Sequence, residues 1–293
     1  MKLWRELFDP RGSDTLGARA QALAFELVVI YGVQADLFGW ATSIPNQPGI
    51  LAPAGIARYV DVSFMLNARC LQLSVFFTCA MLALGLLRLA RGAYLLALVG
   101  YHLEYVARYS LGKLGHASNV LGFALLALGA ADLAFRDPTL RRRASQGLML
   151  ILLSISYTWA GICKLLATGL GWPDGHHLQF WLREKLVDAV SAAGDVKYNP
   201  VQRVVLRHVN VATLMLTFGL LSELCSSLML LRRARRWVLL SLCGMHMGIL
   251  YAMDIAFMNN IYVLLSLALP IGEAVDALVK RYEARFARDA SPV

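Results

Sequence analysis

A lysine lies within a long apolar stretch of the sequence. Lys164 occurs in SYTWAGICKLLATGL, and helical spacing places Tyr157, Ala160 and Gly161 on its face, seven, four and three residues away. Small residues of this kind let a second helix approach closely. Because an ionisable group is costly in hydrocarbon, Lys164 points to function. One interpretation is a buried amine that desolvation keeps neutral and able to accept a proton, and the other is a lysine whose ammonium reaches the outer interface.

Several histidines and an aspartate are expected on the same side of the protein as Lys164. Each one, taken singly, is interpreted as a packing or interfacial residue more readily than as a catalyst. Their expected convergence at one end of the apolar segments nevertheless favours a shared pocket at the outer face of a membrane. The residues concerned are His116, His176, His177, His246 and Asp254.

The same residues do not have the spacing of a metal centre. The sequence contains no HxxxH, no HExxH and no pair of carboxylate-rich helices. His176 and His177 are adjacent, so they would point in different directions on a helix. A serine hydrolase is disfavoured as well, because there is no GxSxG elbow. We therefore expect no metal.

Other ionisable residues in the apolar segments are interpreted as structural or peripheral. Glu104 and Arg108 are four residues apart on one helical face, so we expect them to form an ion pair. Glu26 and Glu223 fall toward the cytoplasmic side of their segments, away from the histidines. They are therefore less obvious members of the outer pocket.

Apolar segments long enough to cross a bilayer must position these residues. The chain is 58% hydrophobic and 16% charged, with a mean hydropathy of +0.57, which is outside the usual range of soluble domains. A spanning helix needs roughly 20 apolar residues because bilayer hydrocarbon is roughly 30 Å thick. We predict an all-α, polytopic transmembrane bundle of about eight spans, at 19–41, 66–87, 93–112, 117–135, 145–169, 208–231, 237–256 and 259–279.

Positive charges gather at every second connection between these segments. Because short cytoplasmic loops are rich in Lys and Arg, this alternation places both termini in the cytoplasm. Membrane topology thus accounts for the net charge of +9, and nucleic acid is not expected as a partner. The clusters include Lys2, Arg5 and Arg11, then Arg88 and Arg91, then Arg141, Arg142 and Arg143, then Arg232 and Arg233, and finally Lys280 and Arg281.

Two connections, 42–65 and 171–207, contain most of the material outside the membrane. Residues 1–293 are expected to form a single transmembrane helical domain, without a luminal substrate-binding domain. Helical spacing of apolar residues in the second connection predicts an amphipathic helix on the outer surface, which we expect to act as a lid. These apolar residues are Leu178, Trp181, Leu182, Leu186 and Val190.

The stretch around Lys164 resembles a known family. YTWAGICKLLATGLGW, followed by PDGHHLQFWL, is similar to a signature of the vitamin K-dependent gamma-carboxylase family and of its bacterial relatives, the horizontally transferred transmembrane domain proteins. Further stretches agree in order: GHASNVLGFALLALG, FGLLSELCSSLMLL and MHMGILYAMDIAFMNNIYVLL. The resemblance covers most of the chain, and its specific part is the region of Lys164.

The resemblance implies an integral enzyme of the bacterial inner membrane. Such an enzyme would use a reduced, vitamin K-like quinone to modify a secreted peptide or a small substrate at its periplasmic or extracellular face. By resemblance, Lys164 is the base that deprotonates the reduced quinone, and His116 assists it by hydrogen bonding. The other candidate pocket residues are Tyr157, Trp172, His176, His177, Glu223, His246 and Asp254.

The sequence also departs from the family pattern. Cys163 stands in place of the first lysine of a pair, Leu166 in place of an aspartate, and Gly115 in place of an asparagine before the histidine. The large luminal domain that binds protein substrates has no counterpart in this sequence. An alternative is therefore a non-enzymatic membrane scaffold, or a partner in the maturation of secreted peptides, in which Lys164 joins helices. A transporter ranks lower, because neither paired broken helices nor an inverted repeat is evident.

Overall fold

The computed structural model describes residues 7–8, 14–45, 51–112, 116–194 and 198–289. All elements of these residues are α-helices or short 3-10 helices, so the prediction of an all-α fold is confirmed. Lys2, Arg5 and Arg11, on which the expected N-terminal orientation depends, lie outside the described residues.

The helices follow the predicted apolar segments closely. Each of the first seven segments corresponds to one helix, and the eighth is divided between two. In chain order they are α2 (Leu16–Ser43), α3 (Ala68–Leu86), α4 (Ala93–Ser110), α5 (Asn119–Ala134), α6 (Pro138–Thr168), α9 (Val209–Leu224), α10 (Arg232–Met253), and α11 (Met258–Ala268) with α12 (Ile271–Asp289).

Five of these helices are long and apolar enough to cross a membrane, or six if α11 and α12 are counted together as one span. They include α9, which continues through a 3-10 segment, Cys225–Leu230. Helix α5 has only 16 residues, and α4 includes both Glu104 and Arg108. The protein is thus a multi-pass membrane protein. By helix length and composition, five or six helices of the described residues qualify as membrane spans, fewer than the eight predicted.

Large apolar side chains on the outside of the helices agree with a hydrocarbon environment. Leu73 and Phe76 on α3 are 68% and 74% exposed, and Leu214 on α9 is 70% exposed. In water, an apolar surface of this extent would favour association. In a bilayer it is in contact with lipid, whose tails are as apolar as leucine.

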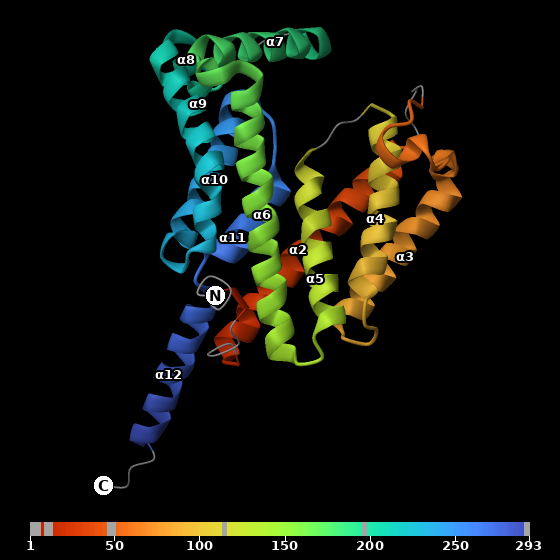
Figure 1. The fold of residues 1–293 in the computed structure, drawn as a ribbon, viewed down its shortest axis with the longest axis vertical. Coiled ribbons are helices and arrows are strands. Elements are labelled where there is room, and N and C mark those ends of the chain that lie inside the picture. Colours follow the sequence, from red (N-terminus) through yellow and green to blue (C-terminus); the bar gives the residue numbers. More distant parts are fainter. Residues whose placement is uncertain (1–6, 9–13, 46–50, 113–115, 195–197, 290–293) are drawn as a thin grey trace. The chain divides into compact units, whose positions relative to one another are not determined.

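The chain forms two compact units. The first consists of residues 1–149 and 269–293, and the second consists of residues 150–268. In the first unit α3 lies beside α4, and α4 contacts α5 (Figure 1). Phe25, Leu71, Tyr94 and Leu121, from four different helices, are almost completely buried there.

Helices α2 and α12 of the first unit meet at two glycines. The Gly17 amide donates to Asp276 Oδ1 at 2.8 Å, and the Gly272 amide donates to Gln21 Oε1 at 3.0 Å. Each helix therefore satisfies an amide in the first turn of the other. A Cβ atom on Gly17 would lie 2.1 Å from the Gly272 carbonyl oxygen, so only glycine permits this contact.

The expected ion pair between Glu104 and Arg108 is wrong. Glu104 is fully buried and neither of its carboxylate oxygens has a hydrogen-bond partner among the described residues. The Arg108 guanidinium lies instead over the Trp40 ring, 5.4 Å from its centroid. Sequence spacing allowed the pair, but the aromatic ring of α2 provides a competing cation–π contact. Glu26 pairs with Arg88 from the turn after α3.

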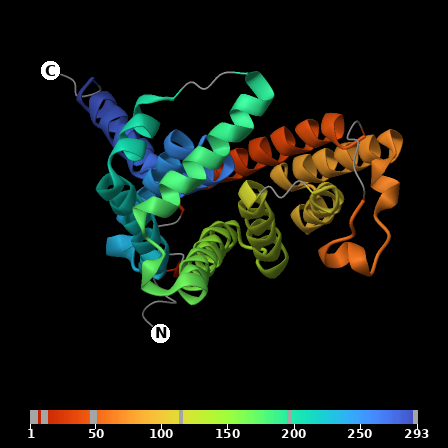
Figure 2. The same cartoon turned by 90° about the horizontal axis from the view of Figure 1, so that it is seen from above.

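In the second unit, the amphipathic helix expected in the connection 171–207 is present as α7 (Gly175–Ala193). Helix α7 runs crosswise to α6, as Figure 1 shows from the side and Figure 2 from above. Its first half is fixed in place, because Gln179 donates to the Val205 carbonyl at 2.9 Å and the Gly175 amide donates to Thr213 Oγ1 at 3.0 Å.

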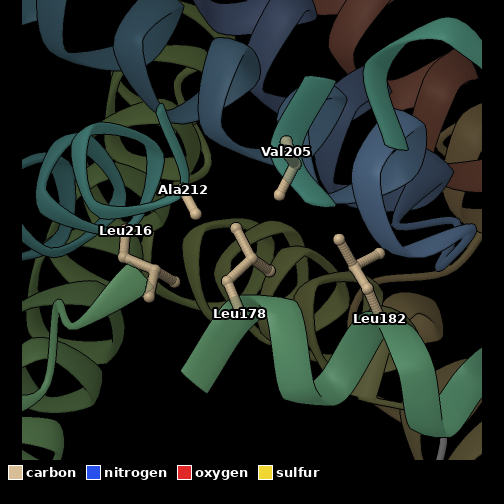
Figure 3. Packing of buried hydrophobic residues seen from close by; sticks show 5 residues of the cluster. All are labelled: Leu178, Leu182, Val205, Ala212 and Leu216. Atoms are coloured by element: carbon tan, nitrogen blue, oxygen red, sulfur yellow. The ribbon is translucent and has the colours of Figure 1, made fainter. Parts of the chain in front are cut away.

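The apolar face of α7 covers α8 (Pro200–Arg207) and the beginning of α9. Figure 3 shows the buried residues of this cluster, which are Leu178, Leu182, Val205, Ala212 and Leu216. Trp181 packs against the cluster, whereas Val190 is 43% exposed and the Leu186 side chain is outside the described part. The first half of α7 therefore has a packing function, and a lid movement of the remainder stays a prediction.

Candidate functional site

Lys164 belongs to the last two turns of α6, at a close contact with α9. A Cβ atom on Gly161, one turn earlier, would lie 3.0 Å from Leu224 and 3.2 Å from the Cβ of Glu223. The glycine therefore brings the α6 backbone against α9, as the small residues beside Lys164 predicted. This register places Lys164 beside a point well inside the span Val209–Leu230.

The Lys164 ammonium is bound by a carboxylate. Its Nζ lies 2.5 Å from each of the two carboxylate oxygens of Glu223. The Glu223 side chain is only 7% exposed and that of Lys164 is 31% exposed. Glu223 was placed toward the cytoplasmic side of its segment and was nevertheless named as a candidate pocket residue. It contacts Lys164 because the offset between α6 and α9 brings the two residues to the same level.

Trp172 closes over the same ammonium. After α6 the chain turns through the 3-10 segment Gly169–Gly171, in which Gly169 has a positive φ of 64°. The turn returns the Trp172 ring to 4.8 Å from Lys164 Nζ, measured to the ring centroid. A cation–π contact of this kind stabilises a charged lysine.

A second polar group lies two turns deeper on the same face of α6. The Tyr157 hydroxyl is 2.7 Å from His246 Nε2 of α10, and Asn260 Nδ2 of α11 donates to the same hydroxyl at 3.0 Å. His246 Nδ1 and Asn260 Oδ1 are buried and have no hydrogen-bond partner among the described residues. Tyr157 thus joins three helices, and two polar atoms beside it are unsatisfied.

A partly open cavity of about 250 Å³ lies between α9 and α10, next to Lys164. Among the described residues that line it, Lys164 is the one ionisable residue and the others are apolar, so a ligand there meets a single charged group of this part of the chain. The lining consists of Lys164, Trp172, Leu178, Met215, Leu216, Phe218, Gly219, Gly244, Met245, Gly248, Ile249, Ala252 and Met253.

The three glycines in this lining are not required for helix packing. A Cβ atom added to Gly219, Gly244 or Gly248 would find its nearest neighbour at 3.6, 3.8 and 3.7 Å, which is ordinary van der Waals contact. A glycine in a helix is less favourable than alanine by roughly 1 kcal/mol. The structure gives no packing reason for these glycines, and their lack of side chains leaves more room in the cavity.

Three of the residues predicted from the sequence are surface groups. His176 and His177 are exposed at the start of α7, where the His177 ring stacks on Trp181 at 6.2 Å between centroids. Asp254 is exposed and follows α10 in the left-handed conformation, with a φ of 54°. None of the three lines the cavity.

The remaining predicted residues of the second unit fall into two groups. Lys164, Glu223 and Trp172 form the charged group, and Tyr157 with His246 forms the neutral one. His116 begins a 3-10 segment, His116–Ser118, of the first unit, and its side chain is outside the described part. The expected convergence of the histidines is thus not seen in the described second unit, where only His246 is buried.

Asn260 and the cavity glycines were missed from the sequence. The signal for two of them is GMHMG, since Gly244 and Gly248 form a GxxxG pattern in an apolar segment. That pattern is typical of close helix contacts, whereas here it lines a cavity. Asn260 has no comparable signal, because one asparagine in an apolar segment is compatible with many contacts.

The arrangement can bind an apolar ligand and exchange a proton with it. Within the described residues, no group of three or more His, Cys, Asp or Glu side chains has the arrangement of a metal site. Lys164 has three ammonium hydrogens, and its nitrogen donates to both carboxylate oxygens of Glu223.

Comparison with protein families, with curated proteins and with solved structures gives no match in any of the three.

Proposed function

We propose that this chain is a membrane enzyme similar to the membrane domain of the vitamin K-dependent gamma-carboxylases. It uses a reduced quinone to modify a peptide or small substrate at the outer face. One observation carries the proposal: Lys164, which is paired with Glu223, lies at the wall of an apolar cavity whose lining includes three glycines.

The cavity residues fit a quinone ring. The described lining residues other than Lys164 are apolar, and Lys164 supplies a hydrogen-bond donor for a ring oxygen. Trp172 offers an aromatic face beside that donor. A reduced quinone, when bound, supplies two electrons and a weakly acidic hydroxyl group.

Lys164 and Glu223 would then act together on the hydroxyl proton. Transfer of one proton from Lys164 Nζ to Glu223 removes two charges from an apolar site at once, and it leaves a neutral amine at the cavity wall. That amine accepts the proton of a hydroxyl group in the cavity. The ammonium formed in this way is stabilised by the Trp172 ring.

Two measurements test the proposal. Long-chain quinone should co-purify with the wild type and raise its thermal midpoint, since a ligand that binds only the folded state stabilises it. Lys164→Ala and Lys164→Arg should abolish turnover, because neither side chain can present a neutral amine. The mechanism is wrong if either variant retains full activity, and the cofactor is wrong if saturating quinone leaves the midpoint unchanged.

The alternative function is a non-enzymatic scaffold or a partner in the maturation of secreted peptides. A specific observation favours it: polar contacts join α6 to α9 and to the 3-10 segment after it, both at Lys164–Glu223 and at Thr158, whose hydroxyl is 2.9 Å from Ser226 Oγ. In this case Lys164→Met combined with Glu223→Gln should preserve function in cells, whereas the enzyme would lose it.

The proposal includes eight crossings, with both termini in the cytoplasm and the substrate side at the periplasmic or extracellular face of a bacterial inner membrane. The positions of α4 and α5 within predicted spans support it. Single cysteines at Arg88 and at His176 should be labelled by impermeant maleimide from opposite sides of the membrane. Labelling of both from one side would refute this topology.

A further inference from the structure

The cavity beside Lys164 has one wall that faces lipid. Most lining residues of α9 and α10 are buried or half-buried, but Phe218 is 46% exposed and Gly244 is exposed. Both belong to candidate membrane spans, Val209–Leu230 and Arg232–Met253, and both lie near the middle of those spans. This wall is therefore at hydrocarbon depth and away from the aqueous ends of the helices.

On the lipid-facing side of the cavity, side chains of α9 lie opposite glycines of α10. A Cβ atom on Gly244 would lie 3.8 Å from Cζ of Phe218, and one on Gly248 would lie 3.7 Å from Cε of Met215. At two successive turns, a long side chain of α9 thus reaches van der Waals distance of the Cβ position of a glycine of α10. We call these four residues, Met215, Phe218, Gly244 and Gly248, the α9–α10 seam.

The seam can open without movement of a helix. Phe and Met side chains change rotamer far faster than helices separate, and Met is especially adaptable in shape. No Cβ atom on the α10 side of the seam opposes such a rotation, because both positions are glycine. Behind the seam is the cavity wall that also contains Lys164.

We propose that the α9–α10 seam is a lateral opening through which a lipid-borne ligand enters the cavity directly from the bilayer. The ring of the ligand lies in the cavity, and its long apolar tail remains between Phe218 and Gly244 and extends into lipid. This inference rests on the proposed function and deepens it, because it specifies a membrane-dissolved ligand with a tail.

The test compares two probes that differ only in the tail. These are 2-methyl-1,4-naphthoquinone and its derivative with four isoprenyl units, each titrated into protein in lipid nanodiscs. Binding is followed by quenching of tryptophan fluorescence, and Trp172→Phe identifies the signal of the cavity tryptophan. Gly244→Leu should weaken binding of the tailed probe at least ten-fold more than it weakens binding of the tailless probe, because the ring meets only the inner side of this position, whereas the tail must pass it.

Gly39→Leu is the matched control. Gly39 is an exposed helical glycine of α2 with open space around its Cβ position, so the same substitution there should affect neither probe. Phe218→Ala provides an independent measurement that does not depend on added bulk. It should accelerate association of the tailed probe several-fold, because the larger of the two covering side chains is removed.

The outcomes separate this inference from the proposed function. If the wild type binds both probes and Gly244→Leu binds them unchanged, or loses both equally, the lateral opening is wrong and the cofactor proposal stands. The same conclusion follows if Gly244→Leu alters the oligomeric state and leaves probe preference unchanged, since the GxxxG pattern would then join two copies of the chain. If the wild type binds neither probe, the cofactor and the lateral opening are both wrong.

Discussion

The Lys164 ammonium nitrogen lies 2.5 Å from both carboxylate oxygens of Glu223, although 59 residues separate the two along the chain. The carboxylate is almost fully buried, and the lysine reaches the wall of an apolar cavity. In hydrocarbon, neither charge is stable without the other, so the properties of the site belong to the pair.

Removal of one partner should therefore cost more than removal of both. Glu223→Gln leaves the ammonium unpaired, and we expect a loss of about 1–3 kcal/mol, limited by the partial exposure of Lys164. Lys164→Met leaves a buried carboxylate and should cost at least as much. The double variant should recover part of the loss, and a double-mutant cycle on unfolding in detergent measures the coupling. Strict additivity would contradict the pairing.

The Tyr157 hydroxyl should contribute to stability in a way that another buried tyrosine does not. Tyr157→Phe leaves His246 Nε2 and Asn260 Nδ2 without their partner, with an expected cost of about 1–3 kcal/mol. Tyr94 is the control, because its buried hydroxyl has no hydrogen-bond partner among the described residues. Tyr94→Phe should be neutral or stabilising, and equal thermal shifts for the two variants would argue against the Tyr157 network.

Two glycines of the second unit should respond to alanine in opposite directions. Gly161→Ala forces a Cβ atom to within 3.0 Å of Leu224, so we expect a loss of roughly 1–3 kcal/mol from overpacking. Gly219→Ala has 3.6 Å of room and should gain up to about 1 kcal/mol from helix propensity. The same Gly219→Ala protein should bind quinone more weakly. Thermal midpoints and quinone titrations check the pair, and a stabilised variant with full affinity would show that the glycine does not shape the ligand site.

The contact of α2 with α12 offers a test in the first unit. Gly17→Ala places a Cβ atom 2.1 Å from the Gly272 carbonyl oxygen, which the two backbones cannot accommodate without separating. Loss of the Gly17–Asp276 hydrogen bond follows, and we expect a destabilisation of roughly 2–3 kcal/mol or more. Gly39→Ala on the same helix has open space and should be neutral or stabilising. A proteolysis assay on the C-terminal helix gives a local measure, and equal cleavage of the two variants would refute the contact.

Much of the fold is predictable from the sequence because its determinants are local. Apolar length alone marks the positions of α2, α3 and α6, and their observed bounds lie within a few residues of the predicted ones except at the start of α6. The eighth segment was predicted as one helix and is divided at Pro270, which is consistent with the inability of proline to continue a helix.

The site was predictable only in part. Lys164 stands out because its charge is costly in any apolar segment, and Trp172 follows it within a short turn. Glu223 was a candidate pocket residue by resemblance, but its contact with Lys164 was not predicted, because depth along a single span does not give the offset between two spans. His176 and His177 were assigned to the pocket because they were expected on the same side of the membrane as Lys164, but both are exposed at the start of α7.

The sequence by itself determined that this protein is helical and crosses a membrane, since hydropathy and helix length are properties of each segment alone. It also determined that Lys164 requires a partner or a function. Only the tertiary structure decided that the partner is Glu223 and that the cavity lies between α9 and α10. The reason is the close contact at Gly161, which sets the register of α6 against α9, and such a register depends on the fit of two surfaces that no single segment encodes.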